Sequence, residues 1–136
     1  MNMINRTLSL LLMALLISAC TSSTDDAMQP IQALESGDYR VELLAEDGAL
    51  SAGTNAIGVR VLQNGNAVAA TDASLVFSMP AMGTMPYMES SATVAPVGDD
   101  LSGTIDLSMG GGWNVQMDVQ TPSGPLRGTF RVQVQE

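Results

Sequence analysis

The stretch that decides the fold class is WNVQMDVQ, residues 113–120. Apolar Trp113, Val115, Met117 and Val119 alternate there with polar residues. Successive side chains of a β-strand point to opposite faces, so this alternation predicts a strand with one face in a hydrophobic core and the other in solvent. We expect Trp113 and Met117 to be core residues on the apolar face, although Trp113 is also able to cover a bound cation.

The same period of two recurs along most of the chain after residue 35. Polar turns separate the alternating segments, and Asn64 and Gly65 form a hairpin signal because both tolerate positive φ. Together these signals predict an all-β fold, an immunoglobulin-like antiparallel β-sandwich of about seven strands. The expected strands cover residues 39–43, 56–62, 74–77, 92–95, 102–107, 113–120 and 129–135.

The N-terminus has the features of a secretion signal. A short start with Arg6 precedes the apolar run LSLLLMALLI at residues 8–17, and small residues follow up to Cys20. A bilayer-spanning helix needs about 20 apolar residues, so this run predicts a cleaved signal peptide over residues 1–19. The run Ile-Ser-Ala-Cys ending at Cys20 resembles the bacterial lipobox, which implies lipidation of Cys20. The alternative interpretation is a buried hydrophobic helix.

Lipidation would make the membrane the first partner of the mature protein. We expect residues 20–34 to be the lipidated cysteine and a flexible linker, and residues 35–136 to form the folded domain. Thr21 follows the cysteine, and a residue other than Asp at that position resembles the default signal for the outer membrane. The expected location is therefore the cell envelope, on the outer membrane facing the periplasm.

Charge and composition exclude several classes of function. The chain has a net charge of −9, with no His and with Cys20 as its one cysteine. Nucleic-acid binding needs a basic patch, and most acid–base or nucleophilic catalysis needs His, Lys or free Cys. We therefore expect neither a nucleic-acid-binding protein nor an enzyme.

Methionines concentrate in MPAMGTMPYM, residues 79–88, where Met79, Met82, Met85 and Met88 recur at a constant spacing of three. The prolines in this segment favour a polyproline conformation, whose three residues per turn would align the four sulfurs along one edge. Thioether sulfur is a soft ligand that selects Cu(I). The segment therefore predicts a Cu(I) site.

Further residues could contribute to this site. Met109 lies in a glycine-rich loop and is a possible additional sulfur ligand, while Glu89 is a possible hard ligand. Methionine also fills irregular cores and lines adaptable binding surfaces. The alternative function is therefore a non-metal interaction module of the cell envelope, in which the Met-Pro loop binds a protein partner.

The segment FSMPAMGTMP, residues 77–86, resembles the motif of YtkA-like domains, which are related to the FixH proteins. The run from Gly103 to Trp113 resembles the strand, small loop, glycine and tryptophan pattern of that family, and the match covers nearly the whole folded region. Thr84 spaces the second Met-Pro pair farther from Met82 than the tighter family form. The resemblance implies an exported immunoglobulin-like sandwich without catalytic activity, with a link to copper handling and to an envelope partner in that process.

Overall fold

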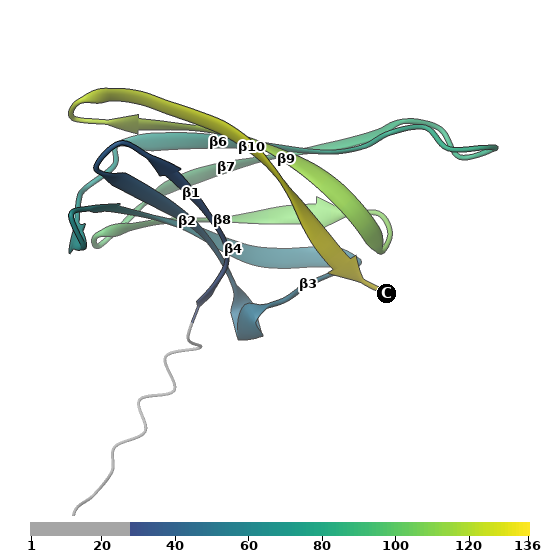
Figure 1. Ribbon diagram of the computed structural model, residues 1–136. Helices are drawn as coiled ribbons and strands as arrows, with labels where there is room; N and C mark the ends of the chain where they lie inside the picture. The colour runs from purple at the N-terminus through teal and green to yellow at the C-terminus, as the bar shows by residue number, and fades with distance from the viewer. Residues whose placement is uncertain (1–27) are drawn as a thin grey trace, which may run out of the picture.

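The computed structural model describes residues 28–136 (Figure 1). The expected signal peptide, Cys20 and the first part of the linker lie outside these residues. The described part contains ten strands and one short 3-10 turn, η1 (Glu46–Gly48). The strands are β1 (Gln29–Ser36), β2 (Tyr39–Ala45), β3 (Leu50–Ser51), β4 (Gly53–Gln63), β5 (Asn66–Ala67), β6 (Asp72–Met79), β7 (Met88–Val97), β8 (Asp100–Leu107), β9 (Gly111–Thr121) and β10 (Gly124–Gln135).

The all-β prediction is confirmed, and the strands form one curled sheet in the order β1-β2-β4-β8-β7-β6-β9-β10-β3. All neighbours on this path are antiparallel except β10 and β3, which are parallel. The sheet curls at β7, because residues 88–94 of this strand pair with β6 and residues 94–97 pair with β8. The two halves of the sheet therefore face each other as in a sandwich (Figure 1).

The opposite side of the sandwich is closed by side chains rather than by a continuous ladder. The Nε2 atom of Gln32 in β1 donates a hydrogen bond to the carbonyl oxygen of Arg131 in β10, at 3.1 Å. Leu34 packs so closely over Gly128 that a Cβ there would lie 2.1 Å from a Leu34 methyl carbon. A larger residue at position 128 would therefore force the Leu34 side chain to move.

Strand β1 differs from the sequence-based expectation. It begins at Gln29, inside the range 20–34 that was expected to be a flexible linker. Its sequence QPIQALES lacks a clean alternation and includes Pro30, so it carries little local strand signal. Contacts with other strands stabilise β1 instead, since β1 pairs with β2 and places Leu34 against β10.

The core lies between the two halves of the sheet and follows the alternation in the sequence. Trp113, Val115, Met117 and Val119 are each at most 1% exposed, which confirms Trp113 and Met117 as core residues. Burying a side chain of this size contributes about 1.5–3 kcal/mol, so β9 alone stabilises the sandwich substantially. The hairpin signal is also confirmed, because Asn64 and Gly65 adopt φ of 50° and 81° between β4 and β5.

Candidate functional site

The methionine segment forms the tip of a long hairpin between β6 and β7. Met79 pairs with Met88 at the end of the regular ladder, and Met82 pairs with Met85 as an isolated antiparallel bridge. The Met82 amide donates to the Met85 carbonyl at 3.1 Å, and the Met85 amide donates back to the Met82 carbonyl at 2.9 Å. In Figure 1 this hairpin extends as a thin ribbon well beyond the rest of the sandwich.

The local sequence explains this shape. Gly83 has a φ of 58° and opens the two-residue turn, which fits a type II′ turn with glycine at its first central position. Pro80 and Pro86 lack an N–H group, so they interrupt the ladder between the two methionine pairs. The hairpin therefore continues in register from β6 to the turn, but only Met82 and Met85 exchange hydrogen bonds near its end.

This hairpin replaces the polyproline arrangement that the methionine spacing suggested. Residues three apart in a pleated strand point to opposite faces, so the four sulfurs do not line one edge. The structure instead brings the methionines together as two cross-strand pairs. We call Met79 and Met88 the base pair, and Met82 and Met85 the tip pair.

The base pair belongs to the body of the protein. Met79 is only 4% exposed, and its methyl carbon would lie 3.1 Å from a Cβ built on Gly111. Met88 is partly buried against the core, and its sulfur accepts a hydrogen bond from the Ser108 hydroxyl at 3.3 Å. The Met79 side chain is therefore buried and that of Met88 is partly buried. The contact of Ser108 with Met88 was not predicted from the sequence.

Met109 and Trp113 also lie at the base rather than at the tip. Met109 packs against the core, and its carbonyl oxygen accepts the indole N–H of Trp113 at 3.1 Å. Trp113 is only 1% exposed, so its ring is not available to cover a cation at the tip. These positions place Met109 beside the base pair, where it contributes to packing.

The tip pair is accessible. Met82 is 59% exposed and Met85 is 37% exposed, and Tyr87 beside them is 56% exposed. Directly opposite residues of an antiparallel pair point to the same face, with Cβ atoms about 4.5–5.5 Å apart. The two thioethers can therefore approach one another, on a segment that carries no charged residue between Met79 and Met88.

Glu89 is engaged by its neighbour on the hairpin. The Tyr87 hydroxyl donates to the Glu89 carboxylate at 2.7 Å, and this hydrogen bond is the main reason why the pKa of Tyr87 is raised. The described residues contain no group of three or more His, Cys, Asp or Glu arranged to hold a metal ion. Sulfur is therefore the ligand type that the hairpin offers.

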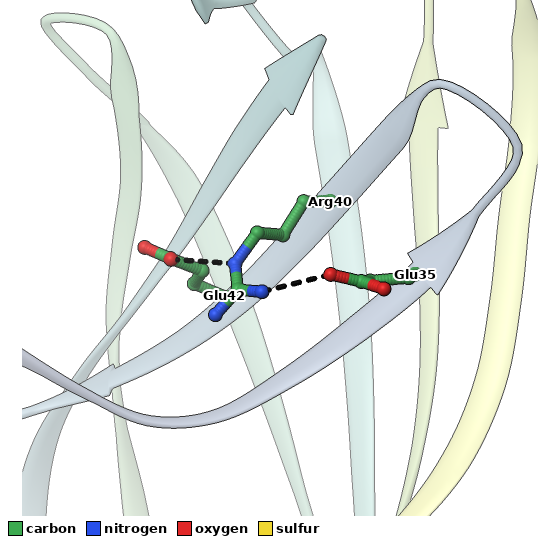
Figure 2. A network of polar contacts seen from close by, with 3 residues as sticks. All are labelled: Glu35, Arg40 and Glu42. Atoms are coloured by element: carbon green, nitrogen blue, oxygen red, sulfur yellow. Dashed lines mark hydrogen bonds and ion pairs between the residues drawn. The ribbon is translucent and has the colours of Figure 1, made fainter. Parts of the chain in front are cut away.

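The arginines of the sandwich are largely held in ion pairs away from the hairpin. Figure 2 shows Arg40 between Glu42 and Glu35, with N–O distances of 3.0 and 2.9 Å. The hydrogen bond to Glu42, followed by that to Glu35, raises the pKa of Arg40. Arg60 makes two hydrogen bonds to Asp100, and the pKa of Arg60 is raised mainly by them. These groups stabilise the outer face of the sheet.

Apart from the hairpin, the surface has a groove of about 520 Å³ between β1 and β10. Its walls include Gln32, Gln133 and Gln135, and no methionine lines it. The sequence did not reveal it because β1 was expected to be linker. Among the described residues there is also no helix long and apolar enough to cross a bilayer.

Comparison with known proteins assigns the chain to a family. The model of the YtkA-like family matches residues 33–118, which is more than half of the chain and includes the whole methionine hairpin. No curated protein matches the chain.

Two solved structures resemble it. A DUF4426 family protein from Pseudomonas aeruginosa PAO1 superimposes with a TM-score of 0.55 and 12% identity, over 76% of this chain and 96% of that one. A predicted lipoprotein from Bacillus anthracis gives a TM-score of 0.41 and 12% identity, over 82% of this chain and 88% of that one. The similarity to the DUF4426 family protein supports the all-β fold. The family match over residues 33–118 shows that the protein belongs to the YtkA-like family.

Proposed function

We propose that this protein is a non-enzymatic lipoprotein of the cell envelope that binds Cu(I) at the tip of its methionine hairpin. The observation that carries the proposal is the tip pair, two exposed methionines held directly opposite each other. The proposed ligands are Met82 and Met85. Met79 and Met88, which the sequence grouped with them, serve instead to fix the base of the hairpin to the core.

The geometry of the tip suits one soft ion. The two Cα atoms of a hydrogen-bonded antiparallel pair lie about 5.5 Å apart, and each methionine has three rotatable side-chain bonds. Both sulfurs can therefore reach a common ion without a change in the backbone. Thioethers select Cu(I), and they need no deprotonation to bind it.

The position of the tip suits transfer of the ion. Figure 1 shows the hairpin extending away from the body of the sandwich, so that another protein can approach it without contacting the rest of the domain. The segment also carries no charge, although the chain as a whole has a net charge of −9. An acidic surface concentrates cations nearby without competing as a soft ligand.

The proposed anchor rests on the N-terminal sequence. The apolar run at residues 8–17 and the small residues before Cys20 support cleavage and lipidation there. Two or more acyl chains anchor a protein stably. Thr21 supports placement on the outer membrane, with the domain in the periplasm.

Competition for Cu(I) tests the metal proposal. The mature protein is titrated anaerobically with Cu(I) in the presence of a chromophoric competitor. We expect near-stoichiometric binding, abolished in a Met82→Leu/Met85→Leu variant and retained in the matched Met79→Leu/Met88→Leu variant. Absence of competition by the unmodified protein would refute Cu(I) binding.

A second candidate function is that of an interaction module without metal, favoured by the exposure of Met82 and Tyr87 at the tip. Exposed Met and Tyr side chains are enriched at protein-binding surfaces. In that case a photo-crosslinker placed at Ala81 would capture the same envelope protein whether or not a Cu(I) chelator is present. Capture that requires Cu(I) would favour the metal proposal instead.

A further inference from the structure

The methionines of the hairpin and of the neighbouring strand β9 differ in accessibility, with Met88 partly buried between the two extremes, and this contrast has a chemical consequence. Met82 is 59% exposed and Met85 is 37% exposed, whereas Met79 is 4% exposed and Met117 is 1% exposed. Oxidants attack the thioether sulfur, and methionine sulfoxide is a polar group that disrupts methionine-rich interfaces. Exposure therefore decides which sulfurs react while the protein is folded.

We propose that Met82 and Met85 form an oxidation site, at which peroxide converts both thioethers to sulfoxides and disables the tip without unfolding the domain. The sulfur lone pair attacks one oxygen of the peroxide, an S–O bond forms and the O–O bond breaks. The sulfur is oxidised and the peroxide is reduced. The second oxygen leaves as hydroxide and takes the proton from the oxygen now bonded to sulfur, which gives the sulfoxide and water.

Protection of the other sulfurs is built into the base of the hairpin. Met79 is enclosed by the core and by the backbone at Gly111. The Met88 sulfur already accepts a hydrogen bond from Ser108, which occupies one of its lone pairs. The base pair therefore keeps the hairpin attached to the sandwich while the tip pair is modified.

Oxidation of the tip leaves the fold intact because the tip contributes nothing to the core. The buried cluster between the two halves of the sheet includes Met79 and Met117 but neither Met82 nor Met85. The added oxygens are placed in solvent, where a polar group has no desolvation cost. The modified protein should therefore unfold at the same denaturant concentration as the unmodified one.

The functional consequence rests on the proposed Cu(I) function. A sulfoxide presents an oxygen in place of the soft thioether donor, and soft donors are what select Cu(I). Oxidation of the tip pair would then switch off copper binding under oxidative stress. Methionine sulfoxide is reduced enzymatically, so the switch is reversible.

The test uses the mature lipidated protein in detergent and hydrogen peroxide as the probe. Mild, increasing doses are followed by peptide mass spectrometry, which counts the oxygen added at each methionine. We expect Met82 and Met85 to be modified while Met79 and Met117 are not, with an unchanged urea midpoint. Modification of Met79 or Met117 at the same dose, or unfolding on oxidation of the tip, would overturn the proposal.

Copper titration of the oxidised protein forms the second arm. We expect loss of Cu(I) binding after oxidation and its return after treatment with methionine sulfoxide reductases for both epimers. Undiminished binding by the oxidised protein would overturn the switch. If the protein that was never oxidised does not bind Cu(I), the proposed function fails, while the selectivity of oxidation still decides the modification site separately.

Discussion

Truncation of Met79 to alanine tests the division of the methionines into a base pair and a tip pair. Met79 is 4% exposed, and its methyl carbon reaches the backbone at Gly111. Removal of a buried Met side chain costs about 2–5 kcal/mol, because both the lost burial and the cavity left behind destabilise the fold. In a domain of this size each kcal/mol lowers the melting temperature by roughly 4–8 °C.

The matched control is Met82→Ala. Met82 is 59% exposed on the tip, so its truncation should change the free energy of unfolding by no more than about 0.5 kcal/mol. The two substitutions remove the same atoms from two ends of the same hairpin. Any difference between their free energies of unfolding therefore reflects the burial of the side chain, because the atoms removed are the same.

Urea unfolding, followed by the fluorescence of Trp113, measures both variants. Trp113 is the one tryptophan of the chain and is 1% exposed, so unfolding transfers it to water. We expect a lower midpoint at constant slope for Met79→Ala, and an unchanged midpoint for Met82→Ala. Equal losses in the two variants, or a loss below about 1 kcal/mol for Met79→Ala, would refute the assignment of Met79 to the core.

Three further predictions concern other parts of the chain. Gly103→Ala would place a Cβ 2.6 Å from the Thr93 carbonyl oxygen, so it should destabilise the sandwich by about 1–3 kcal/mol in the same urea assay. Tyr87 should lose its proton at a higher pH than an ordinary tyrosine, because its hydroxyl donates to Glu89. Glu89→Gln should move that titration back toward lower pH, as followed by NMR of the tyrosine ring; an unmoved titration would contradict the hydrogen bond. Cys20→Ala should abolish labelling by radioactive palmitate and release the protein from the membrane fraction, and persistent labelling would contradict lipidation at Cys20.

The fold could be predicted from the sequence wherever one face of a strand is buried and the other is exposed to solvent. Strand β9 is the clearest case, since each of its apolar residues from Trp113 to Val119 proved to be core. Strand β1 could not be predicted, because its stability comes from pairing with β2 and from the contact of Leu34 with Gly128. The contact of Leu34 with Gly128 joins residues far apart in the sequence, and the residues of β1 themselves lack the alternation that would have marked a strand.

The methionine segment could be located from the sequence, but the pairing of its residues could not. The spacing of the methionines and the presence of Pro80 and Pro86 marked the segment correctly as unusual. The same spacing fits a polyproline turn or a hairpin, and the pairing of β6 with β7 decides for the hairpin. That pairing separates Met79 and Met88 from Met82 and Met85, which no spacing rule reveals.

The most direct test of copper binding at the tip is NMR of the methionine methyl groups during an anaerobic Cu(I) titration. Each methyl carbon is bonded to the sulfur, so its signal reports on the ligand that holds the ion. We predict that the methyl signals of Met82 and Met85 shift together and saturate at one Cu(I) per chain, while those of Met79, Met88 and Met117 stay in place. Shifts at Met79 and Met88, or no shift at any methionine, would contradict it.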